Sequence, residues 1–131
     1  MGETCRKRNL VKEFYIPNQG DIVKLSFDPQ AGHEQKGWRP GLVISNYTFN
    51  KATGFIVVCP ITNTNRNYPF HVKLPDNCKI SGVIMIDQAK SLDYKIRNAE
   101  FVTKISRDIV ENILAIHRAI FQDDGTAGAN Q

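Results

Sequence analysis

The stretch Asp21-Ile22-Val23-Lys24-Leu25-Ser26-Phe27-Asp28 alternates apolar and polar side chains from Val23 to Phe27. A period of two is typical of a β-strand with one buried face. Four further short apolar segments complete a set of five expected strands: 42–44, 55–61, 71–74 and 83–86. Residues 83–86 do not alternate, which indicates a strand covered on both faces.

The segments between these strands are rich in residues that favour turns. Gly, Pro, Asn and Asp are concentrated in 32–37, 46–54, 63–69 and 75–82. Such residues mark turns and loops. Short strands separated by turns, without intervening helices of a dozen residues, favour a compact antiparallel sheet or small barrel over a parallel βαβ fold.

One clear helical pattern occurs, near the end of the chain. Ser106 is a suitable N-cap residue, and isoleucines then recur every three or four positions. They are Ile109, Ile113, Ile116 and Ile120. The pattern predicts a C-terminal helix packed on the sheet. His117 falls on the same apolar side, so we interpret it as a half-buried packing residue.

Length and composition indicate one soluble domain. The chain has 131 residues, of which 41% are hydrophobic and 23% charged. We expect a domain over residues 14–121, with flexible tails at 1–13 and 122–131. No apolar run approaches the ~20 residues that cross a bilayer, and no secretory signal is visible. The three cysteines lack CxxC spacing, which favours free thiols and a cytoplasmic location.

Common site signatures are missing from the sequence. His33, His71 and His117 fall on different expected elements, and no Cys or carboxylate stands at metal-ligand spacing to them. Phosphate-binding glycine loops and the serine-hydrolase elbow are also absent. We therefore expect neither a metal nor another cofactor. The net charge of +4 gives only weak support for a polyanionic partner.

Polar residues of several chemical types gather in the loop after the first expected strand. Within seven residues the sequence places His33, Glu34, Lys36, Trp38 and Arg39. Long loops between short strands often carry function. The alternative is an ordinary solvated loop.

The chain is similar to the MazF family, also called PemK-like, the endoribonuclease toxins of bacterial toxin–antitoxin pairs. The similarity covers residues 15 to about 121 and rests on short blocks in a fixed order. These blocks are Tyr15-Ile16-Pro17, Gly20-Asp21-Ile22-Val23, Phe27-Asp28-Pro29, Gly32-His33-Glu34-Gln35, Arg39-Pro40, Val43-Ile44-Ser45, Cys59-Pro60-Ile61-Thr62, Tyr68-Pro69-Phe70 and Asp87-Gln88.

The resemblance implies a small SH3-like antiparallel barrel of about five to seven strands with short helices. It also implies a homodimer that cuts single-stranded RNA without a metal and is neutralised by a cognate antitoxin. The family's catalytic pair corresponds to Arg39 and Thr62, and its loop acid to Glu34. The RNA groove, formed by the first loop and the Asp-Gln pair, corresponds to His33, Gln35, Lys36 and Gln88.

These residue types suit RNA cleavage by the neighbouring 2′-hydroxyl. The reaction passes through a phosphorane with extra negative charge and leaves a 2′,3′-cyclic phosphate and a 5′-hydroxyl. A guanidinium at Arg39 can bind two phosphate oxygens, and the Thr62 hydroxyl can donate to a third. Because arginine, with a pKa above ~12, is a poor base near neutrality, we expect Glu34, or alternatively His33, to accept the 2′-hydroxyl proton.

Several points stay open at the level of sequence. Trp38 is suited either to stacking on an unpaired base or to covering the barrel or a dimer contact. Ser26 replaces an acid that is common in the family, and Asn67 replaces a glycine, a mild change because asparagine tolerates positive φ. Two other functions remain: a gyrase poison with the same fold, and a non-catalytic RNA-binding module. An acidic, partly disordered antitoxin segment would suit a basic groove.

Overall fold

The computed structural model describes residues 14–28, 37–64 and 67–126. Seven strands, two α-helices and one short 3₁₀ helix, η1, lie in these ranges. Their bounds are β1 Asp21–Ser26, β2 Trp38–Val43, α2 Tyr47–Thr53, β3 Phe55–Thr62, β4 His71–Lys73, β5 Val83–Met85, η1 Ile86–Gln88, β6 Lys90–Asp93, β7 Glu100–Lys104 and α3 Arg107–Ile120. The mainly β fold is thus confirmed, and the five expected strands correspond to β1–β5.

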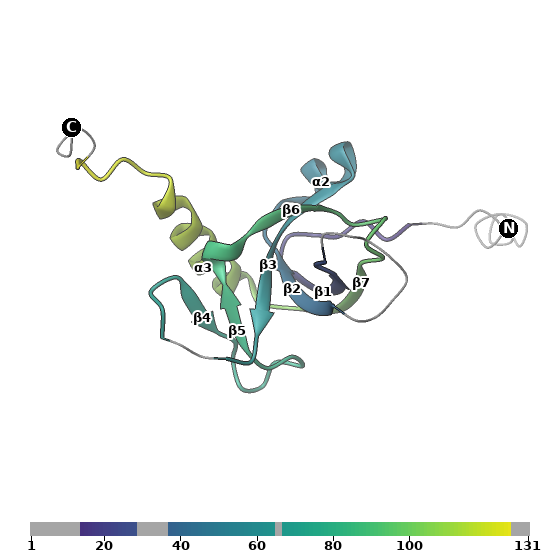
Figure 1. Ribbon diagram of the computed structural model, residues 1–131, viewed down its shortest axis with the longest axis horizontal. Helices are drawn as coiled ribbons and strands as arrows, with labels where there is room; N and C mark the ends of the chain where they lie inside the picture. Colours follow the sequence, from purple (N-terminus) through teal and green to yellow (C-terminus); the bar gives the residue numbers. More distant parts are fainter. Residues whose placement is uncertain (1–13, 29–36, 65–66, 127–131) are drawn as a thin grey trace, which may run out of the picture.

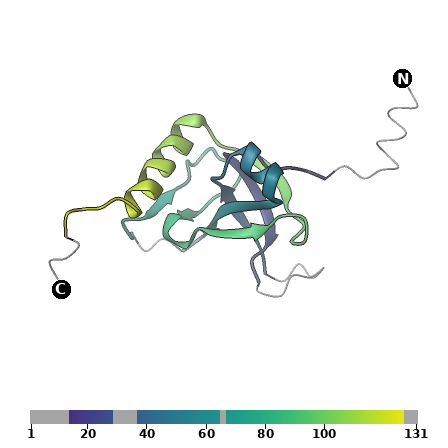
Figure 2. The same ribbon diagram turned by 90° about the horizontal axis from the view of Figure 1, so that it is seen from above.

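All strand pairs in the described residues are antiparallel, and β3 pairs with three other strands, β2, β5 and β6 (Figure 1). Five strands follow the order β6-β3-β2-β1-β7. The β4-β5 hairpin pairs with the last two residues of β3. In Figure 2 the sheet curls on itself, with α3 along one side of it. The long β3 strand therefore connects the curled part of the sheet to the hairpin.

The central strands bury side chains on both faces. One buried cluster is made of Val23, Leu25, Val43, Ile56, Val58, Leu92 and Tyr94. A second cluster contains Ile22, Leu42 and Cys59 together with Val110 and Ile113 of α3. The expectation that residues 21–28 bury only one face is therefore wrong at both ends of β1, because Ile22 packs in the cluster that includes α3 and Ser26 is also buried.

Helix α3 confirms the predicted C-terminal helix, with two differences in detail. Ser106 has the extended backbone of an N-cap residue, but its side chain makes no capping hydrogen bond. The apolar stripe also reaches solvent at its end, since Ile120 is 41% and Phe121 74% exposed. His117 is half-buried as predicted, and its ring meets the edge of Phe121 with 5.1 Å between centroids.

Residues 46–54, which the turn-forming residues predicted to be a loop, contain helix α2. The Asn46 side chain accepts a hydrogen bond from the amide of Phe49 at 2.9 Å and caps the start of the helix. Gly54 ends it with a φ of +77°, a conformation that favours glycine. The asparagine and glycine interpreted as loop residues are therefore the two caps of a short helix.

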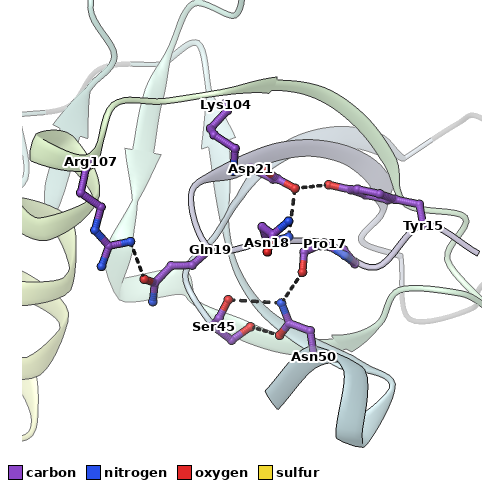
Figure 3. A network of polar contacts seen from close by, with 9 residues as sticks. All are labelled: Tyr15, Pro17, Asn18, Gln19, Asp21, Ser45, Asn50, Lys104 and Arg107. Atoms are coloured by element: carbon purple, nitrogen blue, oxygen red, sulfur yellow. Dashed lines mark hydrogen bonds and ion pairs between the residues drawn. The ribbon is translucent and has the colours of Figure 1, made fainter. Parts of the chain in front are cut away.

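A polar network joins the segment before β1 to the rest of the fold (Figure 3). The buried carboxylate of Asp21 accepts hydrogen bonds from the Tyr15 hydroxyl and from the Asn18 amide, the latter at 2.9 Å. Lys104 of β7 approaches the same carboxylate at 2.6 Å. The three contacts satisfy a charge that would otherwise be costly to bury.

A second part of the network centres on Asn50 of α2, which is fully buried. Its side chain accepts from the Ser45 hydroxyl at 2.6 Å and donates to the Pro17 carbonyl at 2.8 Å (Figure 3). Gln19 accepts a hydrogen bond from Arg107 of α3 at 2.8 Å. Hydrogen bonds therefore connect the segment over residues 15–20 to both α2 and α3.

Candidate active site

The predicted catalytic pair lies at one end of the β2–β3 ladder. Gly41 pairs with Pro60, and Arg39 and Thr62 each stand two residues beyond this pair on their own strands. Gly41 permits close contact here, since a Cβ at this position would lie 2.6 Å from a methyl group of Val58. Antiparallel pairing thus brings two positions 23 residues apart to the same end of the sheet.

The Arg39 side chain is exposed. Within the residues that the structure describes, its guanidinium takes part in no hydrogen bond or ion pair. An arginine in this state keeps all five N–H donors available to an anionic ligand. Its position and its free donors fit a phosphate-binding role.

Thr62 ends β3 in a half-buried position. Its Oγ1 accepts a hydrogen bond from the amide of Thr64 at 3.3 Å. This turn-like contact uses one lone pair of the hydroxyl and leaves its proton available. The Thr62 hydroxyl can therefore still donate a hydrogen bond.

A cavity of about 240 Å³ opens beside Thr62. It lies where β3, the β4-β5 hairpin and η1 meet, and it brings predicted residue Gln88 to the same place as Thr62. Its lining consists of Thr62, Thr64, Tyr68, His71, Met85, Asp87 and Gln88. A larger cavity, of about 400 Å³, lies between residues 75–79 and the start of α3 and contains none of the predicted site residues.

An imidazole–carboxylate pair forms one wall of the cavity beside Thr62. Nε2 of His71 lies 3.2 Å from Oδ1 of Asp87, and the ring of Tyr68 lies over the imidazole with 4.9 Å between centroids. The resemblance assigned the Asp-Gln pair to the RNA groove, but it gave no role to Tyr68, which lies in one of its blocks, or to His71. His71 lies on a three-residue strand, and no sequence motif there indicates a contact with Asp87. Only the arrangement of the strands in space shows this pair.

Trp38 begins β2 opposite Ser26 and is half-buried. Its indole N–H is buried and has no hydrogen-bond partner in the described part of the chain. Such a donor is costly to leave unpaired. Both interpretations of Trp38, base stacking and covering of the barrel or a dimer contact, stay predictions.

Four predicted residues, His33, Glu34, Gln35 and Lys36, lie outside the described residues. The ends of their loop are joined by a hydrogen bond from the Phe27 amide to the Gly37 carbonyl at 3.3 Å. Gly37 adopts a φ of +89°, which favours glycine. The loop therefore returns to the sheet immediately before Trp38 and Arg39.

Two kinds of feature are absent from the described residues. In that part of the molecule, no three His, Cys, Asp or Glu side chains are grouped so as to hold a metal ion. Nor is any helix there long and apolar enough to span a membrane.

Comparisons with known proteins identify the family. The family model for PemK-like, MazF-like toxins of type II toxin–antitoxin systems matches residues 18–121. Endoribonuclease toxin MazF of Escherichia coli K12 is 39% identical over 85 residues, which cover 65% of this chain and 76% of that protein. Endoribonuclease PemK of Escherichia coli is 34% identical over 111 residues, covering 82% of this chain and 84% of that protein.

Solved structures agree with this assignment. Crystal structures of MazF from Deinococcus radiodurans, alone and with MazE, match 82% of this chain with TM-scores of 0.74 and 0.72. The matches cover 98% and 97% of those chains at 39% and 32% identity. The chain therefore belongs to the PemK-like, MazF-like family of toxins of type II toxin–antitoxin systems.

Proposed function

We propose that this protein is an endoribonuclease toxin that cleaves single-stranded RNA at selected sequences without a metal ion. Relatives named endoribonucleases at 34–39% identity support the activity. The observation that carries the proposal is the placement of Arg39 and Thr62 at the same end of the β2–β3 ladder, where neither side chain donates a hydrogen bond to another described residue. Both can bind one phosphodiester from this end.

The proposed reaction is transfer of the phosphoryl group to the adjacent 2′-hydroxyl. The 2′-oxygen forms a bond to phosphorus, the bond from phosphorus to the 5′-oxygen breaks, and the products carry a 2′,3′-cyclic phosphate and a 5′-hydroxyl. Negative charge on the non-bridging oxygens rises in the transition state. Arg39 donates to both non-bridging oxygens, and the Thr62 hydroxyl donates to a third, ester oxygen of the phosphorane.

Proton transfer is assigned to the loop that precedes Arg39. Glu34 accepts the proton of the 2′-hydroxyl, with His33 as the second candidate, and Arg39 or water supplies a proton to the departing 5′-oxygen. A carboxylate suits the first role better than a guanidinium, since a base that is always protonated near neutrality cannot accept a proton.

RNA binding is assigned to the surface around this pair. Gln35 and Gln88 offer amide donors and acceptors, Lys36 neutralises a phosphate, and Trp38 stacks on an unpaired base. The proposed partners also include a second copy of the chain and a cognate antitoxin with an acidic segment, in the cytoplasm. Complexes of MazE with the similar MazF from Deinococcus radiodurans support the antitoxin.

The test is incubation of the pure protein with a long unstructured RNA in EDTA, followed by mapping of the new ends. We expect internal cuts at a restricted set of sequences, with a cyclic phosphate on one product. Arg39→Ala and Thr62→Ala variants should bind RNA and cut it far more slowly than the wild type. Retention of RNA without any cut, or inhibition of DNA supercoiling with intact RNA, would refute the nuclease in favour of an RNA-binding module or a gyrase poison.

A further inference from the structure

His71 is unusually enclosed for a polar residue beside an open cavity. Its side chain is 6% exposed, whereas the side chain of its partner Asp87 is 37% exposed. The second ring nitrogen, Nδ1, is buried and has no hydrogen-bond partner among the described residues. The contact of Nε2 with Asp87 is thus the one polar contact that the described structure gives this ring.

A buried imidazole with an unsatisfied nitrogen costs free energy, so its position requires an explanation. An apolar side chain would fill the same space beneath Tyr68 without that cost. What the imidazole adds is a polar nitrogen, Nε2, that lies 3.2 Å from Oδ1 of Asp87. This contact can restrain the carboxylate at the cavity, and its other oxygen accepts no hydrogen bond from another described residue.

The rest of the cavity has the chemistry of a site for a single nucleobase. Its volume of about 240 Å³ is below the ~300–1,000 Å³ of pockets for drug-sized ligands, so it suits a small flat group. Tyr68 is 50% exposed and offers an aromatic face, and Met85 adds a polarisable thioether. The carboxylate of Asp87 and the amide of Gln88 supply groups for the polar edge of a base.

We propose that His71 is a positioning residue, which holds Asp87 as the acceptor for the exocyclic amino group of one unpaired RNA base in this cavity. A carboxylate accepts hydrogen bonds and donates none, so it favours adenine, cytosine or guanine over uracil, whose carbonyl oxygens it repels. The inference rests on the proposed nuclease function. It adds that His71 acts on sequence preference through Asp87, and not on the scissile phosphate.

The experiment compares five proteins with the wild type: His71→Leu, His71→Gln, Asp87→Ala, the His71→Leu/Asp87→Ala double variant and His117→Leu. Gln keeps an N–H donor at a similar distance from the backbone, whereas Leu fills the space without one. His117→Leu is the matched control, because it replaces a half-buried histidine of α3 away from the cavity. Thermal melting of each variant separates loss of folding from loss of function.

Cleavage ends are mapped on one long transcript, and kcat/KM is measured on an oligonucleotide taken from the strongest wild-type site. We expect His71→Leu and Asp87→Ala each to lower kcat/KM by about tenfold to a hundredfold, as for a lost hydrogen bond to a charged group. Both should admit uracil at one position where the wild type excludes it. His71→Gln should restore the wild-type preference, and the double variant should be no slower than Asp87→Ala alone.

Two results would overturn the role of His71 in a protein that does cut RNA. They are an unchanged base preference in His71→Leu, whatever its rate, and losses that add in the double variant. A wild-type protein that leaves the transcript intact would instead refute the nuclease function itself. Cleavage by the wild-type protein thus distinguishes a failure of the role of His71 from a failure of the nuclease function.

Discussion

The amide of Thr64 donates a hydrogen bond to Oγ1 of Thr62 at 3.3 Å, just where β3 ends. The contact occupies the acceptor side of the hydroxyl and holds the threonine in place. Its proton remains available to a phosphate oxygen. The effect of substitutions at position 62 should therefore depend on the hydroxyl and not on the shape of the side chain.

Replacing Thr62 by valine keeps the branched shape and removes the hydroxyl. We expect kcat for RNA cleavage to fall by about 10²–10³, the usual loss for one transition-state donor. Thr62→Ser should retain most of the rate. Thr48→Val, at an exposed position of α2, is the control and should cut like the wild type. Equal rates for the valine and serine variants at position 62 would contradict the assigned role.

Arg39 should be sensitive to geometry as well as to charge. Lysine keeps the positive charge but loses the planar fork that binds two oxygens. We therefore expect Arg39→Lys to cut more slowly than the wild type and Arg39→Ala to lose at least a further tenfold, since the remaining charge still stabilises the transition state. Single-turnover cleavage rates measure this order. Arg118→Ala, in the last turn of α3, is the control for loss of one positive charge.

A lysine variant as active as the parent protein would show that charge alone is needed at position 39. An alanine variant with the parental rate would remove Arg39 from the reaction.

The sequence pattern predicted β1 to β5 and α3 because each carries a run or a regular spacing of apolar residues. It did not single out β6 and β7 as strands, and both are short and carry few buried side chains. Of β6 only Leu92 is buried, and Phe101 of β7 is 53% exposed. These strands are defined by pairing with β3 and β1, which no local pattern reveals. The backbone at Asn67, by contrast, could be predicted from the residue type. Its φ of +57° fits the expected tolerance of asparagine for this conformation.

The site could be predicted only in part, for a related reason. The resemblance indicated Arg39, Thr62 and Gln88, and the strand register places the first two at one end of the same ladder. The pairing of His71 with Asp87 joins residues 16 positions apart on β4 and η1. It depends on how the β4-β5 hairpin folds against β3, so it required the three-dimensional structure.

The Asp21 network predicts a stability effect without a direct effect on catalysis. Tyr15→Phe removes one of the hydrogen bonds to the buried carboxylate, and we expect the free energy of unfolding to fall by about 1.5–3 kcal/mol. Asp21→Ala should lower the free energy of unfolding further, because it also leaves the Asn18 amide and the Lys104 ammonium without their partner. Urea denaturation measures both. Tyr47→Phe, at an exposed tyrosine of α2, is the matched control.

If Tyr15→Phe were as stable as the control variant, the hydrogen bond to Asp21 would contribute nothing to folding. A loss of cleavage rate in fully folded Tyr15→Phe protein would connect this network to the active site.

The raised pKa of the buried Cys59 thiol should make the folded protein less stable at alkaline pH. Burial, and secondly the negative charge of Asp87, raise the pKa of this thiol from 9.0 to about 12. Above pH 9 the unfolded chain loses the thiol proton while the folded protein keeps it, so the free energy of unfolding falls as pH rises from 9 toward 12. Cys59→Ala should therefore show a shallower decline than the wild type in urea denaturation between pH 8 and 11. Burial also raises the pKa of Tyr94, and this contribution persists in both proteins. Parallel declines would mean that Cys59 ionises as readily in the folded protein as in the unfolded chain.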